Sequence, residues 1–213
     1  MKNYPDLITA QKLFDDVIKV RRKSPTPFSP QTEKLYMEHC FSVAEIAAKI
    51  AAQTKVLSPA KAYVLGLLHD YGRIKDEQSE KVFHGLVGYD YLNEYGYKEA
   101  AKTAFSHCFY DPRLNLSMYR MQPTDYVRCR EILKNMPFDD YDFLIQLSDI
   151  LNDCGQSCTI EYRFDSVSKR HPLNQEVINQ SIKRINQLKN YFDKKCQKNV
   201  YDLLDIKREK ISV

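Results

Sequence analysis

The chain has 213 residues, of which 43% are hydrophobic and 28% charged, with a formal net charge of +4. This composition is typical of a folded globular protein, and the positive charge is too weak to indicate a nucleic-acid or membrane partner by itself. There is no apolar run of membrane-spanning length and no secretion signal, so we expect a cytoplasmic protein without membrane or nucleic-acid partners, while the oligomeric state is not indicated.

Helical patterns run through almost the whole chain and predict an all-α fold. A first amphipathic helix is expected over residues 5–22, and the prolines between Ser24 and Pro30 end it. A long helix follows over about residues 31–54, where apolar side chains recur at steps of three or four. His39 belongs to that stripe, so we expect it to face the protein interior.

The third predicted helix has a clear start signal. Ser58 is expected to be its N-cap, with Pro59 at the first helical position. The helix covers about residues 60–74 and is apolar on nearly every side, which is typical of a central helix. It holds His69 and Asp70 toward its C-terminal end, where a site can open to solvent.

Two shorter helices are expected after the polar segment 75–81. The first covers residues 84–96 and begins with His84, whereas the second covers residues 97–109 and carries His107 near its end. Both histidines are therefore expected at helix ends.

The second half of the chain continues the helical pattern. Residues 110–123 lack clean periodicity and are predicted to form a loop that could cover a site at His107. A helix then begins at Pro123, and Asp139 or Asp140 is expected to cap the helix that carries Asp149. Residues 159–167 have some strand character, and a last long helix is predicted over 175–198.

The six cysteines form no CxxC motif and are expected to be reduced thiols. Cys40 and Cys108 directly follow His39 and His107. Because neighbouring residues on a helix point about 100° apart, we expect neither thiol to share a site with the histidines.

Imidazole and carboxylate side chains recur in an ordered series along these helices. Such groups bind borderline and hard divalent metals, and a carboxylate in an apolar helix must be paired, hydrogen bonded or metal bound. A single histidine of this kind is usually only a core residue, but the joint pattern predicts a buried site for one or two ions. The series consists of His39, His69, Asp70, His84, His107 and Asp149.

The order of these residues resembles the HD-domain superfamily of metal-dependent phosphohydrolases. The similarity covers about residues 31–155 and rests on the segments YMEHCFSVAEIAAKIA, LGLLHDYGRIK, FHGLVGYDYL, FSHCF and LIQLSDILND. It implies an HD-domain helical bundle in a single domain of residues 1–213, extended by the helix at 5–22 and a helical segment at about 173–206.

The resemblance also assigns roles to the series. The minimal ligand set of the superfamily corresponds to His39, His69, Asp70 and Asp149. The branch that binds two metal ions adds two histidines, which His84 and His107 match. Asp70 would bridge the ions as the catalytic carboxylate, and metal-bound hydroxide would attack phosphorus. This branch favours iron or manganese, although nitrogen and oxygen donors also allow zinc, cobalt, nickel or magnesium.

The substrate implied is a small, nucleotide-like phosphoester or phosphoanhydride. The segment LLHDYGR, followed by HG, looks most like bacterial enzymes that hydrolyse dinucleoside polyphosphates symmetrically, and the GYP motif of cyclic-dinucleotide phosphodiesterases is missing. Arg73 would contact phosphate, with Arg113 and Arg120 as further candidates. Two other interpretations stay open. One is a two-iron oxygenase with the same ligands, and the other is a non-catalytic ligand-binding protein in which the metal has only a structural role.

Overall fold

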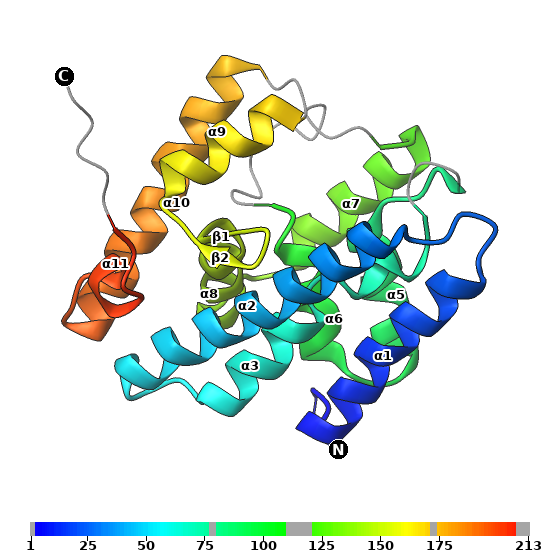
Figure 1. Cartoon of the computed structure of the whole chain (residues 1–213), viewed down its shortest axis with the longest axis horizontal. Coiled ribbons are helices and arrows are strands. Elements are labelled where there is room, and N and C mark those ends of the chain that lie inside the picture. The colour runs from blue at the N-terminus through cyan, green and yellow to red at the C-terminus, as the bar shows by residue number, and fades with distance from the viewer. Residues whose placement is uncertain (1–2, 77–79, 110–120, 171–173, 208–213) are drawn as a thin grey trace.

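Helices make up nearly all the regular structure, which confirms the predicted all-α fold (Figure 1). The computed structural model describes residues 3–76, 80–109, 121–170 and 174–207. The first half of the chain contains α1 (Leu7–Lys23), α2 (Pro30–Thr54), α3 (Pro59–Leu68), the 3-10 helix η1 (Tyr71–Ile74), α5 (His84–Glu94) and α6 (Lys98–Ser106). The second half contains α7 (Pro123–Asn135), α8 (Asp140–Ile150), α9 (Ile160–Arg170), α10 (Gln175–Cys196) and α11 (Val200–Leu203). Strands β1 (Asn152–Asp153) and β2 (Gln156–Ser157) form a small antiparallel pair.

Capping side chains fix where the helices begin. Ser58 accepts a hydrogen bond from the backbone N–H of Lys61 at the start of α3, as predicted. Asp139 caps α8 and exchanges hydrogen bonds with Asp142 in a capping box, which confirms one of the two expected caps. These caps satisfy backbone N–H groups that would otherwise have no partner in the first helical turn.

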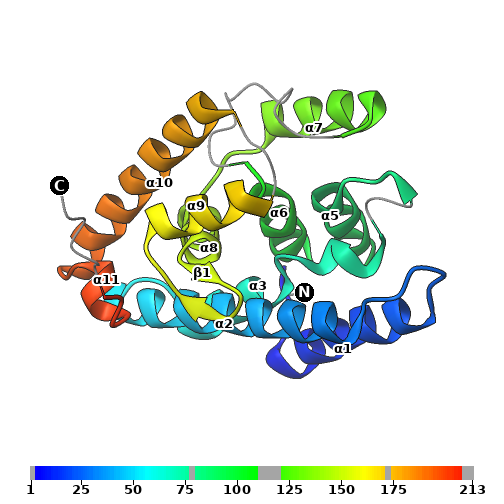
Figure 2. The same ribbon diagram turned by 45° about the horizontal axis from the view of Figure 1, so that its top comes forward.

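The helices pack around one large hydrophobic cluster. Figure 2 shows α1 and α2 along one side of the molecule, α5, α6 and α8 above them, and α7 on the far side, while α10 runs from that side down to α2. The cluster contains almost fully buried side chains from α1, α2, α3, α8 and α10, such as Phe14, Ile50, Leu65, Leu144 and Phe192. A smaller cluster lies beside α5, α6 and α7. In the described residues, no helix has the length and apolar character needed to cross a membrane.

The third predicted helix is shorter than expected. Helix α3 ends at Leu68, and Asp70 leaves the helical conformation with φ −98° and ψ 21° before the chain forms η1. The cause is tertiary: η1 packs so closely on α5 that a Cβ atom at Gly72 would lie 1.8 Å from the His84 carbonyl oxygen. The chain therefore changes direction at His69 and Asp70, between α3 and η1.

The expectations for residues 159–167 and 110–123 in the second half of the chain have different outcomes. The strand character suggested for residues 159–167 was wrong, because residues 160–167 belong to α9, whose buried Ile160 and Phe164 are four positions apart on one helix face. The expected covering loop at 110–123 lies mostly outside the described residues, and the predicted helix start at Pro123 is confirmed.

Candidate metal centre

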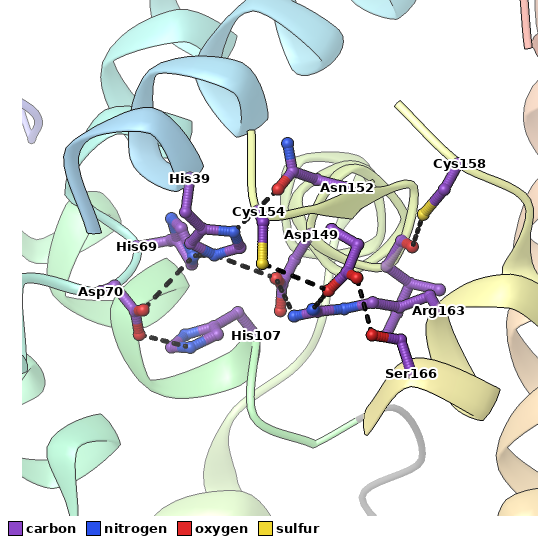
Figure 3. Close-up of polar contacts among 12 residues, drawn as sticks. His39, His69, Asp70, His107, Asp149, Asn152, Cys154, Cys158, Arg163 and Ser166 are labelled. Atoms are coloured by element: carbon purple, nitrogen blue, oxygen red, sulfur yellow. Dashed lines mark hydrogen bonds and ion pairs between the residues drawn. The ribbon is translucent and has the colours of Figure 1, made fainter. Parts of the chain in front are cut away.

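The structure brings the six residues of the series together in the middle of the helical bundle. His39 comes from the middle of α2, whereas His69 directly follows α3 and Asp70 precedes η1. The other three are His84 at the first position of α5, His107 directly after α6, and Asp149 near the end of α8. Figure 3 shows His39, His69, Asp70, His107 and Asp149 around one common region.

A first group of donor atoms is formed by His39, His69 and Asp149. The His39 Nε2 atom lies 3.1 Å from His69 Nε2 and 3.2 Å from an Asp149 carboxylate oxygen. The side chain of His69 is 1% exposed, and those of His39 and Asp149 are 15% and 14% exposed. This group is therefore largely shielded from water, with some exposure at His39 and Asp149.

A second group is formed by His84, His107 and Asp70. The two imidazole Nε2 atoms are 3.3 Å apart. The Asp70 Oδ1 atom lies 3.4 Å from His84 Nε2 and 3.5 Å from His107 Nε2, while Oδ2 lies 4.0 Å from His69 Nε2. Asp70 thus stands between the two groups, with one oxygen toward each.

Cys108 also belongs to the second group, which contradicts the expectation from sequence. Its Sγ atom lies 3.3 Å from His84 Nε2 and 3.5 Å from His107 Nε2. The expectation assumed a regular helix through residues 107 and 108, but α6 ends at Ser106. The 100° offset of helical neighbours therefore does not apply. Cys40 is a buried core residue, as expected from its place on α2.

Backbone and amide oxygens orient the imidazole rings. The Nδ1 atoms of His69 and His107 lie 2.7 Å and 2.9 Å from the carbonyl oxygens of Gly66 and Ala104. His39 Nδ1 lies 3.0 Å from Asn152 Oδ1. Because these oxygens only accept hydrogen bonds, each Nδ1–H donates to one of them, and in the neutral imidazole the lone pair is then on Nε2, which faces the centre.

These tautomers fit a bound cation. With both protons on Nδ1, the 3.1 Å contact between His39 Nε2 and His69 Nε2 joins two lone pairs without a hydrogen between them. Burial lowers the pKa of His69 to about 4, so this imidazole is neutral at neutral pH. Neutral imidazoles and carboxylates are the ligand forms that divalent metals require, so the donor set fits such ions.

The two carboxylates are charged despite their burial. Burial alone would raise the pKa of Asp70, but Arg73, followed by His69, holds it well below its usual value. Burial acts on the Asp149 pKa in the same direction, but the contact with His39 and the nearby His69 and Arg163 outweigh burial and lower this pKa. Both groups therefore present anionic oxygens to the imidazoles.

The arginines predicted to bind substrate have different outcomes. The Nε–H group of Arg73 donates to Asp70 Oδ2 at 2.6 Å, and the Arg73 side chain is 39% exposed. Arg73 is thus attached to the centre and can still be reached from solvent. Arg113 and Arg120 lie outside the described residues.

Sequence reasoning missed a layer of residues behind Asp149. Asn152 could have been found, because it lies three positions after Asp149 in LSDILND. Arg163 of α9 places a terminal nitrogen 3.9 Å from Asp149 and bonds Asp153 at 2.5 Å (Figure 3). Ser166 donates to the same Asp153 at 2.7 Å. Arg163 had no visible signal, because its segment was interpreted partly as strand.

Comparison with protein families gives a match for the central part of the chain. The sequence model of a family described as "HD domain" matches residues 36–152, more than half of the chain, and this range includes all six residues of the series. No curated protein and no solved structure matches the chain.

Proposed function

Because the chain belongs to the HD-domain family, we propose that it is a metal-dependent phosphohydrolase for a small, nucleotide-like phosphoester or phosphoanhydride. HD domains are in general metal-dependent hydrolases, which supports the reaction class. The bond and the substrate are our inference from the chemistry of the site.

One observation carries the proposal: two groups of donor atoms meet at Asp70. His39, His69 and Asp149 form one group, and His84 and His107 form the other, with an oxygen of Asp70 directed toward each. We infer that His39, His69, Asp70 and Asp149 hold one divalent ion and that Asp70, His84 and His107 hold a second, with iron or manganese favoured.

The ions would supply the chemistry that the side chains lack. When bound, a pair of divalent ions activates water for attack on phosphorus and neutralises phosphate oxygens. The protein's own contribution is orientation: Gly66, Ala104 and Asn152 fix the rings of His69, His107 and His39 through their Nδ1 atoms. Such support keeps the Nε2 lone pairs in place before the substrate arrives.

Arg73 supports a phosphate-containing substrate. Its guanidinium donates to Asp70 through Nε–H, which holds a permanently charged planar group of the kind that suits phosphate oxygens beside the centre. The partial exposure of the side chain makes it accessible to a small molecule. A symmetric dinucleoside polyphosphate is one substrate of this class to be tested.

The proposal is tested by elemental analysis of purified protein, followed by a phosphatase screen with iron, manganese, zinc, cobalt, nickel and magnesium. We expect metal to co-purify and phosphate to be released from a nucleotide-like compound. Bound metal without hydrolysis of any compound, together with dioxygen consumption by ferrous protein, would replace the proposal by an oxygenase function. Protein that binds no metal under any condition contradicts the proposal as a whole.

His84→Ala is expected to lower the metal content of fully loaded protein from two ions to one per chain. The substitution removes a donor of the second group and leaves His39, His69 and Asp149 intact. Elemental analysis after dialysis measures the count. His171→Ala is the control, because His171 is the one histidine outside the series. A count of one in both the parent and His84→Ala proteins would show that His84 is no ligand.

Arg73→Ala is expected to keep both ions and to weaken catalysis. Loss of a charge-assisted contact to phosphate costs on the order of 1.5–3 kcal/mol, which lowers kcat/KM roughly ten- to hundred-fold. Steady-state kinetics on the best substrate of the screen measures this effect. Lys75→Ala, at a nearby cation paired with Glu80, should leave kcat/KM unchanged. Equal rates for the Arg73 variant and the parent would show that Arg73 does not contact the substrate.

A further inference from the structure

Cys108 adds a sulfur atom to the second group of donors. Its Sγ atom, His84 Nε2 and His107 Nε2 lie within 4.8 Å of one another and form a compact trio. Building on the proposed function, we propose that Cys108 is a direct ligand of the second ion and that its thiolate makes this position selective for zinc, in place of the iron or manganese expected from nitrogen and oxygen donors alone. The other position, at His39, His69 and Asp149, would keep nitrogen and oxygen donors.

The separations between donor atoms match a tetrahedral zinc site. Zinc binds imidazole nitrogen at about 2.0–2.1 Å and thiolate sulfur at about 2.3 Å, so tetrahedral angles place two nitrogens about 3.4 Å apart and sulfur about 3.6 Å from nitrogen. The observed separation between His84 Nε2 and His107 Nε2 is 3.3 Å. Those from Cys108 Sγ to the two nitrogens are 3.3 Å and 3.5 Å.

Asp70 offers an oxygen near the two histidines of this trio. Its Oδ1 atom lies 3.4 Å and 3.5 Å from the Nε2 atoms of His84 and His107, close to the value of about 3.4 Å expected for oxygen and nitrogen on one tetrahedral ion. Two imidazoles, one thiolate and one carboxylate are a donor set that zinc accepts readily, whereas manganese and magnesium prefer oxygen donors.

The local backbone leaves space for the sulfur atom. Helix α6 ends at Ser106, and the N–H group of Cys108 donates to the Phe105 carbonyl oxygen at 3.4 Å, so the chain turns and brings residue 108 toward His84. A Cβ atom at Gly85 would lie only 3.0 Å from Cys108 Sγ. The glycine beside His84 therefore allows the thiol to approach the imidazole.

Cobalt(II) substitution tests this assignment without relying on activity. A thiolate ligand gives cobalt(II) an intense near-ultraviolet charge-transfer band, which nitrogen and oxygen ligands do not produce. Cobalt(II) alone is added to the full-length parent protein and to Cys108→Ser, Cys108→Ala and Cys40→Ala, with bound cobalt counted by elemental analysis. Cys40→Ala is the matched control, because Cys40 also follows a histidine of the centre but is buried in the core.

We expect the charge-transfer band in the parent and in Cys40→Ala, and its loss in both Cys108 variants. Competition with a chelator should show a loss of zinc affinity of at least ten-fold in Cys108→Ser, since even residues behind the ligands cost ten- to hundred-fold. Two cobalt ions in the parent without the band would overturn the role of Cys108 and leave the proposed function intact. Absence of bound cobalt in the parent would instead contradict the proposed function. A band that persists in folded Cys108→Ala would also overturn the assignment.

Discussion

Asp70→Ala is expected to reduce kcat/KM by about 10³-fold or more, the largest loss of activity predicted for this chain. Asp70 places one oxygen near His84 and His107 and the other near His69, so its removal affects both donor groups. Metal ions in such sites contribute several kcal/mol of transition-state stabilisation, and each 1.36 kcal/mol corresponds to a factor of ten in rate.

The measurement combines kcat/KM with metal content for the same preparation of Asp70→Ala. Bound metal should fall along with the rate, while circular dichroism should show that the apolar helices remain folded. Asp90→Ala is a suitable control, because Asp90 pairs with Arg128 at the surface. If Asp70→Ala retained both ions and the parent rate, Asp70 would be neither a bridge nor a catalytic ligand.

The positions of the helices could be predicted where local signals determine them. Ser58 and Pro59 define the start of α3, and Asp139 defines the start of α8, because caps act within a single helical turn. That the six residues of the series meet at one site could also be predicted from local signals. His39 and Asp149 each interrupt an apolar helical face, and such groups need partners, which the other members provide.

Other features depend on contacts between segments that are distant in sequence. Helix α9 contains Tyr162 and Phe164, which favour strands in isolation, yet burial of Ile160 and Phe164 on one face stabilises a helix. Cys108 approaches His84 only because α6 stops one residue before His107. Arg163 reaches Asp149 from beyond the matched family range, so no spacing within residues 36–152 could reveal it.

The break between α3 and η1 also depends on a contact between segments that are distant in sequence. The largest effect on stability that we predict concerns this contact, at Gly72. Gly72→Ala should lower the free energy of unfolding by about 3 kcal/mol or more. A Cβ atom at this position would lie 1.8 Å from the His84 carbonyl oxygen and 2.7 Å from the Gly88 nitrogen. Both are backbone atoms of α5, so no side-chain rotation can relieve the overlap, and the whole helix must move.

Because His84 is the first residue of α5, that movement should also separate its Nε2 atom from His107 and Asp70. Urea unfolding and elemental analysis of Gly72→Ala are therefore expected to show lower stability together with loss of the second ion. Gly96→Ala provides the contrast: Gly96 has φ +82°, but a Cβ atom there would meet no described heavy atom within 4 Å, so only the left-handed conformation is penalised, by about 1–2 kcal/mol. Its metal content should equal that of the parent. A Gly72→Ala protein as stable as the parent would show that η1 and α5 do not pack through Gly72, and the placement of His84 would then need another cause.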